Sequence, residues 1–186
     1  NNFQGNAQYE EPFYIYQTLN EFFNVVDLTL EVTIIPDNID QLLIIHPKNL
    51  NDETLYAIDQ FVMSGKGVTF FIDPFSEFDN NLSKPEEEKD FSSSNLSKIF
   101  TSWGFDVKPG MIAGDIVNGR KVSLGNANNQ KIVTYVLWLA IQENLLSKKD
   151  IVTANLDYVF LKSAGSIENL KTNNSLLIEP LVSTSA

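Results

Sequence analysis

The stretch LLIIHPKNLNDETLYAIDQFVMSGKGVTFFIDPF, residues 42–75, decides the fold expected for this chain. It opens with a continuous apolar run, which is typical of a parallel strand covered on both faces. A helix follows, and its apolar face consists of Leu55, Ile58, Phe61 and Val62. A second apolar run, residues 67–73, ends at Asp73. Two strands joined by one helix over about 30 residues form a parallel pair through a crossover.

The ends of this helix are marked by the chemistry of their residues. Asn51 can cap the N-terminus, where Asp52 and Glu53 favour the positive end of the helix dipole. Gly65 is expected to end the helix in the left-handed conformation. We expect the core between helix and sheet to bury Leu43, Ile45, Phe61, Phe70 and Ile72.

The N-terminal flank and the middle of the chain complete an α/β pattern. Residues 12–23 have helical spacing, and residues 25–35 alternate and are β-branched, which predicts a strand. Residues 76–95 contain little apolar content, so we expect a long solvated loop that is most mobile over residues 79–92. The next predicted helix ends at Gly104.

The last third of the chain has the composition of β structure. The segment KIVTYVLWLAI, residues 131–141, fits a helical period, but its Val, Thr, Tyr and Trp content favours a strand. Residues 118–130 indicate a hairpin with two turns. Short β segments are also predicted at residues 105–117, 150–156, 158–168 and 175–186.

Composition narrows the possible functions. The formal net charge is 13 − 24 = -11, and an acidic chain repels phosphate, so we expect no nucleic-acid partner. There is no cysteine, which excludes disulfides, thiolate zinc sites and cysteine nucleophiles. The acidic cluster at residues 86–90 lacks the glycine turn that orders a calcium loop, so we expect neither a metal site there nor a cofactor elsewhere.

Candidate site residues are few. His46, the only histidine, is interpreted as a strand-end residue hydrogen-bonded to backbone rather than as part of a triad or metal site. Asp73 ends a parallel strand, where α/β folds place ligands, and Asp115 is a second candidate. A turn through Pro74 is the simpler role for Asp73, with its carboxylate accepting N–H groups near Ser76 and Glu77.

A family resemblance adds to this interpretation. Residues 35–75, the segment IFTSWGFDVKPGMIAGD (99–115) and the segment DIVTANLDYVFLKSAGSIE (150–168) resemble the GldG-like auxiliary components of ABC-type transport systems linked to gliding motility. The resemblance covers roughly residues 9–186. It implies a flavodoxin-like core, similar to class I glutamine amidotransferases without their catalytic Cys–His pair. It also implies an extracytoplasmic (periplasmic) domain, tethered by membrane helices outside this segment, that partners an ABC permease and an ATPase.

We therefore expect one extracytoplasmic domain, a piece of a longer protein, with an α/β core at about residues 12–115 and a β-rich part at about 116–186. The expected function is that of a non-enzymatic accessory domain that binds a partner protein or a transported substrate. Two alternatives stay open. One is a hydrolase that uses Asp73 and Asp115, and the other is a small-ligand-binding domain with its site at the strand ends.

Overall fold

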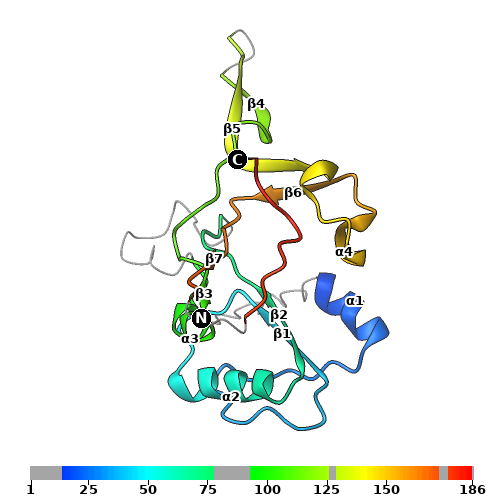
Figure 1. The fold of residues 1–186 in the computed structure, drawn as a ribbon, viewed down its shortest axis with the longest axis vertical. Helices are drawn as coiled ribbons and strands as arrows, with labels where there is room; N and C mark the ends of the chain where they lie inside the picture. Colours follow the sequence, from blue (N-terminus) through cyan, green and yellow to red (C-terminus); the bar gives the residue numbers. More distant parts are fainter. Residues whose placement is uncertain (1–13, 78–92, 126–128, 172–175, 186) are drawn as a thin grey trace, which may run out of the picture.

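A computed structural model describes residues 14–77, 93–125, 129–171 and 176–185 of the chain (Figure 1). The predicted loop 79–92 and its acidic cluster thus lie outside the described residues. The helices are α1 (Tyr14–Phe22), α2 (Asp52–Met63), α3 (Ser97–Trp103), the 3-10 turn η2 (Glu143–Leu145) and α4 (Ile151–Ala154). The strands are β1 (Gln41–Ile45), β2 (Gly67–Phe71), β3 (Phe105–Asp106), β4 (Gly119–Leu124), β5 (Lys131–Gln142), β6 (Tyr158–Lys162) and β7 (Glu168–Asn169).

The predicted strand–helix–strand unit is confirmed. Strands β1 and β2 pair in parallel, from Gln41 opposite Gly67 to Ile45 opposite Phe71. The Asn51 side chain accepts a hydrogen bond from Thr54 N–H and caps α2. Gly65 follows the helix with φ 83°, the left-handed conformation that residues with a Cβ avoid.

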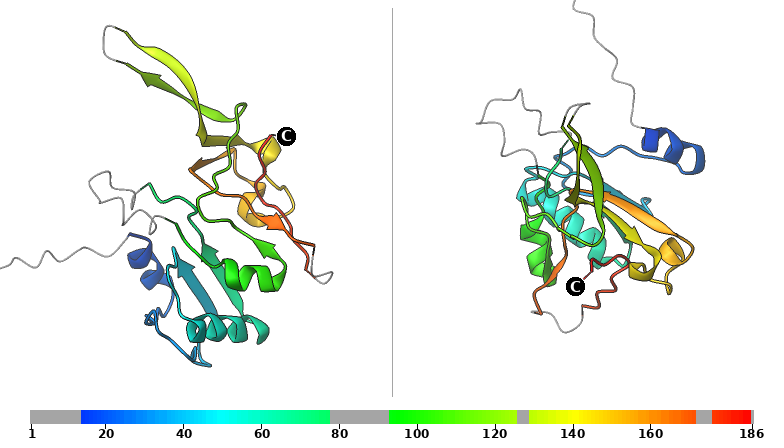
Figure 2. Two further views of the ribbon diagram at one scale, coloured as in Figure 1. Left: turned by 90° about the vertical axis from the view of Figure 1, so that its left-hand side faces the viewer. Right: turned by 90° about the horizontal axis from the view of Figure 1, so that it is seen from above.

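Helices α2 and α3 build the core of this unit on one face of the β1–β2 sheet (Figure 2, left). The core consists of Ile35, Leu42, Ala57, Ile58, Phe61, Leu96, Ile99 and Phe100. Almost full burial was expected for all five residues. It is confirmed for Phe61 and wrong for Leu43, Phe70 and Ile72, which are half-buried. The prediction for Ile45 is wrong, since its side chain is 52% exposed. The expectation assumed that helices cover both faces of the sheet, and Ile45 lies on the face away from the core.

The strand predicted at residues 25–35 does not form. Val32 N–H donates to Thr29 O within the segment, and Leu30 O accepts from the Thr54 hydroxyl of α2. Its apolar residues Leu28, Val32 and Ile35 pack against the α2 core. The segment thus buries apolar area without a strand partner, and β-branched residues alone do not make a strand.

The C-terminal part is organised around an antiparallel sheet of order β4-β5-β6. The predicted hairpin and the strand at residues 131–141 are confirmed, and the hairpin projects from the body in Figure 1. The C-terminal part has an apolar cluster separate from the α2 core, and this cluster consists of Leu139, Ile141 and Leu146. Strands β3 and β7 form a separate antiparallel pair.

Two β predictions in this part are wrong. Residues 151–154 form α4, because the Asp150 side chain caps the helix by accepting from Val152 N–H. The described part of the tail, residues 176–185, contains a single bridge, Leu146 with Val182, instead of strands.

The fold class is mixed α/β, with a small parallel pair and small antiparallel sheets. The α/β class expected from the sequence is therefore confirmed. The described parallel sheet has two strands, and the flavodoxin-like core remains an expectation.

Candidate functional site

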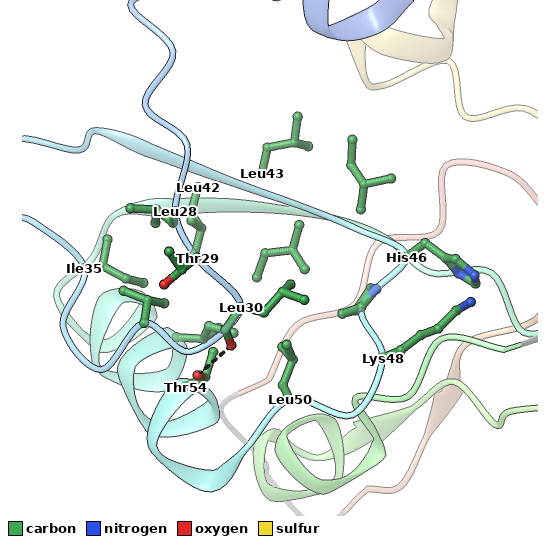
Figure 3. A pocket seen from close by; sticks show the side chains of 15 residues that line it. Leu28, Thr29, Leu30, Ile35, Leu42, Leu43, His46, Lys48, Leu50 and Thr54 are labelled. Carbon is green, nitrogen blue, oxygen red and sulfur yellow. Dashed lines mark hydrogen bonds between the residues drawn. The ribbon is translucent and has the colours of Figure 1, made fainter. Parts of the chain in front are cut away.

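A cavity of about 410 Å³ lies along β1, on the side away from β2 (Figure 3). Apolar side chains of the 28–35 segment, of β1 and of α2 form most of its wall, and His46 and Lys48 lie together at one end. The apolar lining includes Leu28, Leu30, Ile35, Leu43, Ile45 and Leu50. The size and lining are those of a binding pocket. The cavity runs along the length of β1, and neither Asp73 nor Asp115, the candidates expected at the strand ends, is in its lining.

His46 leaves β1 in an unusual backbone conformation, with φ 47°. Its N–H still donates to Phe71 O and continues the ladder to β2. The ring Nδ1 lies 2.7 Å from the Ser94 hydroxyl. The interpretation of His46 as a strand-end residue is therefore confirmed for its N–H, but the ring's partner is a side chain that sequence reasoning missed.

Ser94 fastens the ends of the two parallel strands. Its hydroxyl accepts from Asp73 N–H at 2.9 Å, and its N–H donates to Asp73 O at 2.7 Å. The next residue, Asn95, donates its N–H to Pro47 O. Ser94 is fully buried, so its hydroxyl serves this junction and is not exposed to attack a substrate.

We expect Ser94→Ala to lower the free energy of unfolding by about 1–3 kcal/mol, because it removes the hydroxyl that accepts from Asp73 N–H and bonds the His46 ring. Chemical denaturation measures the change. The neighbouring variant Ser93→Ala is the control and should change stability by less than about 0.5 kcal/mol. Equal effects of the two substitutions would contradict the junction described here.

Asp73, the first candidate residue, lies at the end of β2 and is half-buried. Its Oδ1 accepts from Phe75 N–H at 3.0 Å across Pro74. The donor is one residue earlier than the Ser76 and Glu77 region expected from the sequence. The turn is of the Asx type, in which a side chain holds the backbone two residues on.

Asp115, the second candidate, is buried and accepts five hydrogen bonds. The donors are Val117 N–H, the N–H and side-chain amide of Asn118, and the N–H and hydroxyl of Ser185, at 2.7–3.0 Å. Burial alone raises the pKa of Asp115, but the bonds from Asn118 and Ser185 outweigh it and hold the pKa well below its usual range. The carboxylate thus stays ionised and ties the C-terminal tail to residues 115–118.

Glu77 is a third engaged carboxylate, and sequence reasoning missed it by treating residues 76–95 as one solvated loop. It accepts from Trp138 Nε1 at 3.0 Å, from the Ser163 hydroxyl, and from Lys162 Nζ at 2.8 Å. Burial acts to raise the pKa of Glu77, while the bonds from Lys162, Ser163 and Trp138 lower it on balance. Glu77 therefore joins the chain after β2 to the antiparallel sheet.

Within the described residues, the structure shows no shared carboxylate site, no metal cluster and no membrane-spanning helix. Asp73, Asp115 and Glu77 have no hydrogen-bond partner in common there. In the same residues, no group of three or more His, Asp or Glu side chains is placed to hold a metal ion. No helix in the described ranges is long and apolar enough to cross a membrane.

Comparison with known families supplies the identity. The model of a family described as an ABC-type uncharacterized transport system, auxiliary component, matches residues 3–186. The chain belongs to this family. The match spans both the parallel pair and the antiparallel sheet, so the whole described structure is that of an auxiliary component of an ABC-type transport system.

No curated protein and no solved structure is significantly similar to this auxiliary component. The family assignment confirms the broader part of the resemblance found in the sequence.

Proposed function

We propose that this domain is a non-catalytic auxiliary component that acts by binding a partner protein of its ABC-type transport system. The observation that carries the proposal is the apolar cavity beside β1, which lies next to exposed apolar side chains such as Leu30 and Ile45. A contiguous exposed apolar surface is typical of a site that binds a protein or a ligand.

The state of the carboxylates supports a binding role over a hydrolytic one. A general acid or base needs a pKa near the working pH and access to the substrate. Asp115 is buried, holds five donors and has a lowered pKa, and Asp73 holds the turn at Phe75. Both residues are engaged by the fold, which favours a structural role for each of them.

We further propose that the partners are the permease and the ATPase of the same system, and that the domain acts on the extracytoplasmic side of the membrane. The family assignment supports transporter partners, whereas the extracytoplasmic location rests on the sequence resemblance alone. A link to gliding motility and to GldG-like proteins rests on the resemblance alone.

A small-ligand-binding role is the second candidate, and the same cavity favours it. A volume of about 410 Å³ suits a small molecule, and His46 and Lys48 at one end offer polar contacts. A ligand of this kind would be apolar over most of its length, because the rest of the wall is.

Affinity isolation of the full-length protein from its native membranes tests the proposal. We expect the cognate permease and ATPase to be recovered with it, as identified by mass spectrometry. The same protein without residues 14–185 is the control and should lose both. Recovery that does not depend on these residues would overturn the proposal.

A further inference from the structure

The outer edge of β1 carries backbone groups that point away from its one partner strand. His46 N–H donates to Phe71 O. Along a strand, the N–H and C=O of successive residues alternate between the two sides of the sheet. The backbone N–H and C=O groups of Leu42, Ile44 and His46 therefore point toward β2. Those of Leu43 and Ile45 point to the opposite side. Among the described residues, β1 pairs with β2 alone.

The space that a further strand would fill is the cavity. It runs along all of Leu42 to His46, and the 28–35 segment forms its far wall without a backbone hydrogen bond to β1 (Figure 3). An added strand gains affinity from main-chain hydrogen bonds and specificity from pockets that take alternate side chains. The open edge offers the main-chain hydrogen bonds, and the apolar cavity beside it offers the pockets for side chains.

The charge around the cavity identifies the kind of partner. Residues 14–47 contain no Lys or Arg, and their acidic residues are Glu21, Asp27, Glu31, Asp37 and Asp40. All are exposed, and all except Glu21 lie within two positions in the chain of a residue that lines the cavity, although none lines it directly. Lys48 is the basic residue in the lining, and Lys66 Nζ donates to Asp37 O and Ile39 O, so the four exposed carboxylates are opposed by two ammonium groups. A basic segment complements this rim, whereas a second copy of the chain or an anionic membrane is repelled by it.

We propose that the outer edge of β1 binds an extended segment of a partner protein, with alternating apolar side chains in the cavity and Lys or Arg residues beside them. The inference rests on the proposed function, because it names the surface and the chemistry through which the auxiliary component holds its partner.

The test uses the full-length protein and synthetic peptides of about 15 residues, longer than an ordinary strand, that tile the cognate permease. We expect peptides with an alternating apolar run and adjacent Lys or Arg to bind in fluorescence anisotropy. Replacing those basic residues by Glu should weaken binding by about tenfold or more. Bound peptide should slow hydrogen–deuterium exchange in residues 41–46.

Two variants of one residue separate strand addition from simple apolar contact. Leu43→Pro removes the outward N–H and leaves the bonds between β1 and β2, because proline is tolerated where its nitrogen faces away from the ladder. We expect it to lose binding by about tenfold or more, while Leu43→Ala, which keeps the N–H, stays within about threefold. Circular dichroism confirms that both variants fold.

Three results would overturn the inference. They are the absence of any bound peptide, equal binding by Leu43→Pro and Leu43→Ala, and a dimer in solution that Leu43→Pro dissolves, which would assign the edge to a second copy. If the permease is still recovered with the full-length protein in any of these cases, the proposed function stands and the surface is wrong. If the permease is not recovered, the proposed function itself fails.

Discussion

Replacing Phe100 by alanine is expected to lower the free energy of unfolding by about 3–5 kcal/mol, the largest effect of any single substitution considered for this chain. Phe100 is 1% exposed. Its ring stacks on Phe105 with a centroid distance of 4.7 Å and meets Phe70 edge-on at 5.2 Å. The truncation removes apolar contacts and leaves a cavity where α3, β2 and β3 meet.

Phe71→Ala is the matched control for Phe100→Ala. Phe71 follows Phe70 in β2, but its side chain is 50% exposed, so we expect a loss of about 1 kcal/mol. Urea denaturation followed by tryptophan fluorescence measures both variants. Similar losses would mean that α3 does not pack on the inner face of the β1–β2 sheet.

Asp115→Asn is expected to lower the free energy of unfolding by about 3 kcal/mol, because the new amide group turns donors toward donors in a buried site. The carboxylate accepts from Val117, Asn118 and Ser185, and the asparagine oxygen can serve one side of that set at most. Asp157→Asn, at an exposed residue, is the control and should change stability by less than about 0.5 kcal/mol.

The Asp115 effect has a defined pH dependence. The native pKa lies below the usual value of about 3.9, so the ionised carboxylate stabilises the fold fully above that value. As the pH falls below about 4, the unfolded chain takes up the proton first, and the stabilisation is lost progressively. The difference in stability between wild type and Asp115→Asn should therefore shrink under acid conditions. A difference that stays constant down to pH 2, roughly two units below the usual value, would contradict this account.

Local signals in the sequence predicted the parts of the fold that local chemistry controls. Asn51 caps α2, and Gly65 and Gly104 end α2 and α3 in the left-handed conformation. The prediction of a strand at residues 25–35 is wrong, because a strand needs a partner that one segment cannot specify. At residues 150–156, the local cap of Asp150 prevails over the β preference of its β-branched neighbours.

The candidate site also combines contacts that adjacent residues predict with contacts that only the fold creates. The position of Asp73 at a strand end and its turn through Pro74 follow from adjacent residues, and the structure agrees. The partner of Asp115, Ser185, is 70 residues away in the chain, and Ser163 is 86 residues from Glu77. No spacing or composition pattern connects residues at such distances, so these contacts emerge only from the fold.

Photocrosslinking in native membranes tests most directly whether this domain docks onto its transport system. A photoreactive residue replaces Ile45, which is half-exposed beside the cavity, or Ile151, which is 87% exposed on α4 and serves as the control. We predict a crosslink from position 45 to a subunit of the ABC transport system, and none from position 151. The account would be contradicted if position 45 crosslinks to no subunit of the system while the full-length protein is folded and present in the membrane.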